Sequence, residues 1–181
     1  MASDSSGAPD PSARALVDEA SRKAGLVWLE YEGGGQPRPA WHVWRDGTAY
    51  VVTGGEEQHL PGLDAATVVT VVVPSKDSRA RVVTWRADAA VVTPADDDWA
   101  PAVVALAAGR LNAPEARTAA EQWADGATVI RLRPTGEVVA SPGNQPDGSH
   151  ATVPRETTAT TLGRQPWMLG AKRRASDRNA H

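Results

Sequence analysis

The residues best suited to chemistry lie in one short segment, Thr53-Gly54-Gly55-Glu56-Glu57-Gln58-His59. Two adjacent glycines would let backbone N–H groups approach an anion at a helix start, and a plain tight turn requires the same glycines. His59 beside two carboxylates has the proton-transfer capacity of an acid or base near neutral pH; a surface histidine in a turn is the alternative. The spacing of Glu56, Glu57 and His59 matches no metal signature, so the sequence predicts no metal site.

Aromatic and cationic residues in neighbouring segments have the chemistry to contact a flat anionic ligand. Trp41 and Trp44 are three positions apart, so in a regular strand one points to the core and the other to a cleft, where it would stack on a ring. Core filling is the other role open to them, because the chain has seven Trp and no Phe. Arg81, on the strand face of Trp85, is a candidate phosphate partner. Lys76 is either a solvated turn charge or the cation at that end of a ligand.

The elements that must position these residues form a mainly β domain with flanking helices. Asp10-Pro11 starts the first helix and Asp46-Gly47 turns a hairpin. The Val-rich strand after residue 66 is expected to be buried on both faces, and Asp96-Asp97-Asp98 to cap the second helix. The expected helices are 11–24, 99–110 and 114–123, and the expected strands, about six in number, are 26–32, 38–44, 48–53, 67–73, 80–93 and 127–133. The last strand either closes at Pro134-Thr135-Gly136 or has a short extension through Val138 and Val139.

Length and composition predict one domain with two tails. The chain has 181 residues and no Cys, which excludes disulfides and thiol nucleophiles. We expect a start without fixed structure over residues 1–10, a single domain over 11–140, and a flexible linker with a basic tail over 141–181. No apolar run reaches the ~20 residues of a membrane span and the first residues lack a secretory signal, so we expect a cytoplasmic protein without membrane contact.

The charges are distributed unevenly along the chain. The net charge is −3, yet Arg164 to His181 holds five Lys or Arg residues against Asp177 alone. An acidic body argues against nucleic-acid binding by the folded domain. In the tail, Trp167-Met168-Leu169 precedes the basic Lys172-Arg173-Arg174. Such an apolar cluster docks on its own dimer, docks on a partner protein, or has no fixed role.

The order of these elements resembles the pyridoxamine 5′-phosphate oxidase-like family of split β-barrels over about residues 12–135. The segments that carry the likeness are Gln36 to Trp44, Asp46 to Gly54 and Val68 to Val73. The resemblance implies a split β-barrel that forms a homodimer and binds FMN or the deazaflavin F420 between its subunits. It also implies a flavin- or F420-dependent oxidoreductase of unknown substrate, in which the cofactor supplies the hydride chemistry.

Carried over by position, the resemblance places Arg38, Trp41, Thr53, Gly54 and Gln58 in the cofactor cleft, and Lys76 and Arg81 are added as cations for an anionic cofactor. The chain departs from the family at Glu56-Glu57, where many relatives carry Arg or Lys. A carboxylate repels a phosphate group. The sequence therefore leaves a second function open, a cofactor-free homodimer that acts as a binding or structural protein.

Overall fold

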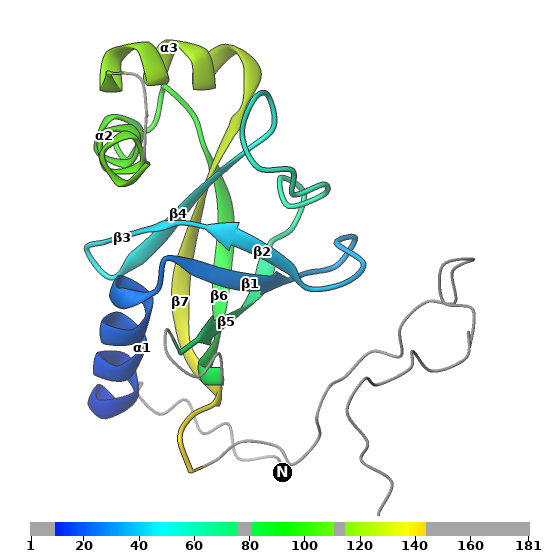
Figure 1. The fold of residues 1–181 in the computed structure, drawn as a ribbon, viewed down its shortest axis with the longest axis vertical. Helices are drawn as coiled ribbons and strands as arrows, with labels where there is room; N and C mark the ends of the chain where they lie inside the picture. The colour runs from blue at the N-terminus through cyan, green and yellow to red at the C-terminus, as the bar shows by residue number, and fades with distance from the viewer. Residues whose placement is uncertain (1–9, 76–80, 111–114, 144–181) are drawn as a thin grey trace, which may run out of the picture. The chain divides into compact units, whose positions relative to one another are not determined.

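The computed structural model describes residues 10–75, 81–110 and 115–143. Within these ranges the chain forms three helices and seven strands (Figure 1). The mainly β architecture predicted from the sequence is confirmed. The helices are α1 (Pro11–Lys23), α2 (Trp99–Gly109) and α3 (Ala116–Gly126), and the strands are β1 (Leu26–Glu30), β2 (Arg38–Trp41), β3 (Val43–Arg45), β4 (Thr48–Thr53), β5 (Val68–Pro74), β6 (Arg81–Val92) and β7 (Thr128–Ala140).

All strands join one antiparallel sheet in the order β2-β1-β5-β6-β7-β4-β3. The two edge strands, β2 and β3, are consecutive in the chain and only His42 separates them. The predicted strand over 38–44 is thus one extended segment whose first half pairs with β1 and whose second half pairs with β4. The sheet therefore curls until its two edges meet at His42, which gives a barrel with a seam.

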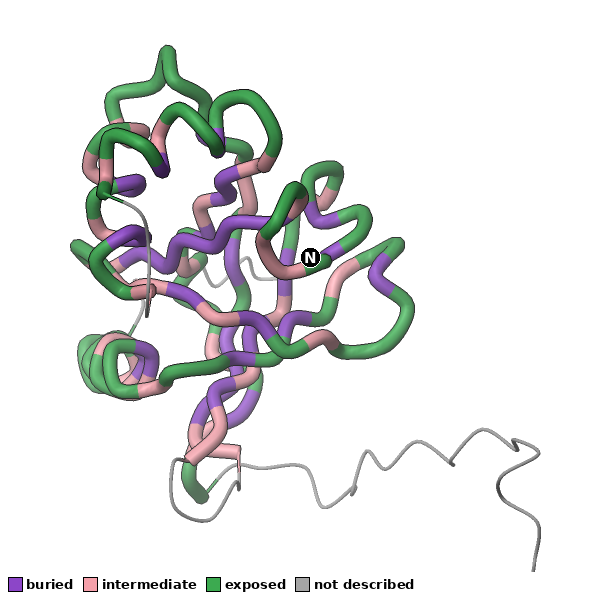
Figure 2. Tube along the Cα trace, turned by 45° about the horizontal axis from the view of Figure 1, so that its top comes forward, coloured by how far each residue is buried: buried purple, intermediate pink, exposed green. Residues whose placement is uncertain are grey.

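Two apolar clusters lie on the two faces of this sheet. The buried positions of the strands are purple in Figure 2. The larger cluster fills the inside of the barrel and includes Leu29, Trp85 and Leu132, with Trp44 packed against it. The second cluster lies between the sheet and the α2–α3 pair, and Trp41 packs there. The prediction that Trp41 and Trp44 point to opposite faces is confirmed, and each ring contacts a core.

Helix α1 begins as predicted, because the Asp10 side chain accepts a hydrogen bond from the Ser12 N–H (3.0 Å) and Pro11 is its first residue. Two side chains from the seam segment then hold the helix on the barrel. Trp44 Nε1 donates to Asp18 Oδ1 (2.6 Å), and His42 Nε2 lies 2.9 Å from the Ser21 carbonyl oxygen.

Three local predictions were wrong. The closure of the last strand at Pro134 is contradicted, because β7 continues without a break to Ala140 and includes the extension through Val138 and Val139 that the sequence left open. The register with β6 shifts between Trp85 and Ala87, and this irregular pairing accommodates a proline, which has no N–H to donate. The β5 strand is buried on one face only, and Val68 is exposed. The side chain of Asp98 does not cap α2; it pairs with Arg131 instead.

The start over residues 1–9, Lys76 and the tail from residue 144 lie outside the described residues. None of the described helices is long and apolar enough to cross a membrane.

Candidate functional site

The segment over residues 53–60 is a tight turn that folds back on the end of β4. The Thr53 hydroxyl donates to the Gln58 carbonyl oxygen (3.0 Å) and accepts from the Leu60 N–H (2.9 Å). The Gly54 N–H donates to the same Gln58 oxygen (3.2 Å), and the Glu57 N–H donates to the Gly54 oxygen (3.0 Å). The Gly54 and Glu57 N–H groups are therefore used within the turn itself.

Both glycines of the turn have the left-handed backbone that favours glycine, with φ of 87° at Gly54 and 58° at Gly55. Gly55 also packs closely on the end of α3. A Cβ atom at this position would lie 2.8 Å from the Gly126 carbonyl oxygen. The need for glycine here comes from this backbone contact as well as from the turn.

The side chain of Gln58 closes the seam of the barrel. Its Oε1 accepts from the Trp41 N–H (2.9 Å), and its Nε2 donates to the carbonyl oxygens of Trp41 and Val52 (both 3.0 Å). A primary amide has two N–H donors, and both are used here. Gln58 thus supplies hydrogen bonds between β2 and β4 where the strand ladder is interrupted.

Glu57 points inward, away from solvent. Its side chain is 5% exposed, its Oε1 accepts from Trp123 Nε1 (2.9 Å), and the same oxygen forms an ion pair with Arg110, whose side chain is 34% exposed. This contact joins the turn to α3 and to the end of α2. The carboxylate therefore occupies, with its own cation and its own N–H donor, the kind of position that an external anion would need.

The other titratable side chains of the 53–60 turn differ from Glu57 in their exposure. Glu56 and His59 are exposed. Among the described residues no group of three His, Cys, Asp or Glu side chains is placed to hold a metal ion. The structure thus brings none of the acids of this segment together with His59 as a ligand set.

The remaining candidate site residues are spread over the barrel. Arg38, on edge strand β2, donates from Nε to the Gly34 oxygen (3.1 Å) and is half-buried. Arg81 opens β6 opposite Pro74, and Lys76 lies outside the described residues. Trp41, Thr53, Gly54 and Gln58 therefore meet at the seam through the hydrogen bonds given above, whereas Arg38 lies at the other end of β2 and Arg81 on another strand.

His42 was not among the candidate site residues, although it is the buried titratable group nearest the seam. Its Nε2 faces the Ser21 carbonyl oxygen, so this nitrogen carries the proton and Nδ1 is left buried without a hydrogen-bond partner. Burial lowers the pKa of His42, and the hydrogen bond to Ser21 opposes this in part. The neutral form is favoured, which suits a helix-docking residue.

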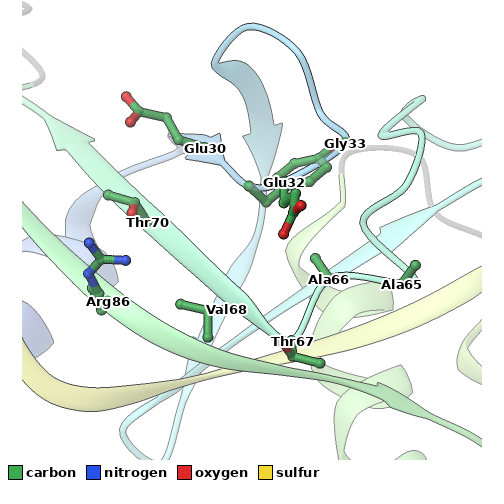
Figure 3. A pocket seen from close by; sticks show the side chains of 10 residues that line it. Glu30, Glu32, Gly33, Ala65, Ala66, Thr67, Val68, Thr70 and Arg86 are labelled. Atoms are coloured by element: carbon green, nitrogen blue, oxygen red, sulfur yellow. The ribbon is translucent and has the colours of Figure 1, made fainter.

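A surface pocket of about 630 Å³ lies on the outer face of β1, β5 and β6 (Figure 3). Glu30, Thr70 and Arg86 form a row across the three strands there, and Glu32 faces the pocket from the adjoining loop. Arg86 is paired with Glu137 (3.2 Å). Two carboxylates and a neutralised guanidinium make this pocket unfavourable for an anion.

Comparison with known proteins identifies the fold. The heme storage protein HutZ from Vibrio cholerae superposes with a TM-score of 0.51 at 15% identity, over 73% of this chain and 94% of that one. A conserved hypothetical protein from Mycobacterium tuberculosis gives 0.52 at 14%, over 68% and 81%. A Listeria innocua protein named for pyridoxamine 5′-phosphate oxidase gives 0.48 at 14%, over 69% and 94%.

This chain is a split-barrel protein. The family resemblance seen in the sequence is confirmed at the level of the fold. No protein-family model and no curated protein matches the sequence.

The turn of this split barrel does not fit a cofactor phosphate. The Gly54 and Glu57 N–H groups donate within the turn, and Arg110, the cation that contacts it, is paired with Glu57. A phosphate placed here would displace the Glu57 carboxylate or sit beside it at a repulsive distance. The amide of Gln58 has no donor left to offer.

Proposed function

We propose that this split barrel is a ligand-binding protein whose 53–60 turn is closed to the phosphate of a flavin or of F420. One observation carries the proposal, the buried Glu57 carboxylate held by Trp123 and Arg110. An internal anion that already satisfies the local cation and donor removes the attraction that a phosphate site supplies. On this proposal the protein binds its ligand, and the 53–60 turn has a structural role.

The test is a titration with FMN of the wild type, Glu57→Gln and Glu56→Gln. Glu57→Gln keeps an oxygen acceptor for Trp123 Nε1 and frees the charge of Arg110. We expect this variant to gain about tenfold or more in FMN affinity, since a charge-assisted hydrogen bond contributes roughly 1.5–3 kcal/mol. Glu56→Gln removes an equal charge at an exposed position and should bind as the wild type does. Equal curves for all three proteins would refute the role given to Glu57.

A second candidate is the flavin- or F420-dependent oxidoreductase implied by the sequence resemblance. The split-barrel fold is compatible with it, and HutZ, which shares this fold, is named as a heme storage protein. On this proposal Arg38 and Trp41 contact FMN or F420, and Arg38→Ala weakens binding by roughly 1.5–3 kcal/mol. Failure of the wild type to bind either cofactor would remove this candidate.

The assembly state belongs to the same proposal. We propose a homodimer formed through the outer face of β1 and β5, supported by Leu26 (52% exposed), Trp28 (42%) and Val68 on that face. Trp28→Arg should convert a dimer into a monomer in light scattering. Val104→Arg, at an exposed apolar position on α2, is the matched control and should leave the mass unchanged. A monomeric wild type at micromolar concentration would exclude this interface.

A further inference from the structure

A cavity of about 690 Å³ is lined in part by α1. Helix α1 lies at the opposite end of the barrel from the α2–α3 pair (Figure 1). The walls of the cavity come from the first half of α1, from the β3–β4 hairpin at Asp46 to Thr48, and from β7 between Arg133 and Val138. The volume is within the range of small-molecule sites in proteins. The 53–60 turn contributes nothing to the lining, so this cavity is separate from the turn.

Two tryptophans form the apolar wall of the cavity. The rings of Trp44 and Trp85 pack edge to face, with centroids 5.7 Å apart and planes at 80°. Trp44 Nε1 is satisfied by Asp18, whereas Trp85 Nε1 is buried without a hydrogen-bond partner. Trp85 is 1% exposed, so it backs this wall from the core, and Trp44 supplies the more accessible ring.

The charges of the cavity are unequally satisfied. Each of its three carboxylates has a partner among the described residues: Asp18 is bonded to Trp44 and Arg22, Asp46 to Arg45 and Glu137 to Arg86. The guanidinium groups of Arg14 on α1 and Arg133 on β7 also line the cavity and are exposed. No hydrogen bond or ion pair engages either of them within the described part of the chain. The available charge at the rim is therefore positive.

We propose that this cavity binds a small aromatic anion, a molecule with a flat apolar body and one acidic group. The body packs against Trp44 and Trp85, and the acidic group meets Arg14 and Arg133 at the rim. The inference rests on the proposed function, since it names the ligand class of the binding protein. It gives the two unpaired arginines and the tryptophan wall one common role.

The test uses two fluorescent probes of the same shape. Anilinonaphthalene sulfonate carries the anionic group, and phenylnaphthylamine has the same ring system without it. The wild type should bind the anionic probe saturably at one site and about tenfold more tightly than the neutral probe. Arg14→Ala and Arg133→Ala should each weaken the anionic probe about five- to tenfold and leave the neutral probe unchanged.

The matched control is Arg117→Ala, which removes an exposed arginine on α3, far from the cavity lining. It should bind both probes as the wild type does. Equal affinity for the two probes, the same loss in Arg117→Ala, or no saturable binding of the anionic probe would overturn the proposal.

The outcomes separate this inference from the proposed function. FMN titration of Glu57→Gln reports on the turn, and the probe series reports on the cavity. Probe binding that fails while Glu57→Gln gains FMN affinity would overturn the cavity alone. The wild type could instead bind FMN tightly, with an affinity that Arg14→Ala and Arg133→Ala do not change. That result would refute the proposal that the turn is closed to phosphate, and the probe result would stand.

Discussion

Replacing Gln58 by Ala should open the seam of the barrel. The Gln58 side chain makes three hydrogen bonds of 2.9–3.0 Å, two with the backbone of Trp41 and one with Val52. A net contribution of about 1 kcal/mol for each bond gives a loss near 3 kcal/mol in the free energy of unfolding. Because Trp41 is only half-buried, water can replace some of the lost hydrogen bonds. We therefore expect the free energy of unfolding to fall by about 2–3 kcal/mol.

The assay is urea unfolding followed by tryptophan fluorescence. Gln58→Glu keeps one acceptor oxygen but loses both donors and faces two carbonyl oxygens with a charge, so it should destabilise at least as much as Gln58→Ala. Gln36→Ala, at an exposed turn position, is the control and should lie within about 0.5 kcal/mol of the wild type. A Gln58→Ala protein as stable as Gln36→Ala would refute the role of the Gln58 side chain in holding the seam together.

Two further predictions concern Gly55 and His42. Gly55→Ala should lower the free energy of unfolding more than Gly35→Ala does. Both glycines have a positive φ, but only a Cβ at position 55 would meet a backbone oxygen. We expect losses of about 1 kcal/mol for Gly35→Ala and over 2 kcal/mol for Gly55→Ala, measured by urea unfolding. Burial lowers the pKa of His42, so below its unfolded value of 6.5 the unfolded chain binds a proton that the folded protein does not. The contribution of His42 to the free energy of unfolding is therefore fully present above pH 6.5. It falls as the pH drops below 6.5, by at most about 1.4 kcal/mol per pH unit. His42→Gln, which retains a donor for Ser21, should remove this slope and His59→Gln should retain it; equal slopes in both would contradict the assignment.

Much of the fold was accessible from local signals. The Asp10-Pro11 start, the Asp46-Gly47 turn and the alternation of β1 act over a few residues, and the bounds predicted from them agree with the structure to within a few positions. The unbroken course of β7 through Pro134 to Gly136 was not predicted, because it depends on a register shift against β6, a different segment. Local rules predict a stop at proline and contain nothing about the partner strand.

The candidate site was less accessible, since its meaning depends on contacts that are distant in sequence. Glu57 was recognised as a departure from the family, but Trp123 and Arg110, which hold it, lie more than fifty residues further along the chain. Gln58 was a candidate cofactor residue, and its bonds to Trp41 show a seam role that only the three-dimensional arrangement reveals. The cofactor roles of Arg38, Trp41, Thr53, Gly54, Gln58, Lys76 and Arg81 remain predictions.

The most direct test of the closed turn is a titration of the freshly purified wild type with FMN and F420, combined with native mass spectrometry of the same preparation. Since the Glu57 carboxylate already satisfies Arg110 and Trp123 Nε1, the split barrel should carry neither cofactor and should bind neither at micromolar concentration. Stoichiometric FMN or F420 in the spectrum, released by Arg110→Ala, would contradict the account.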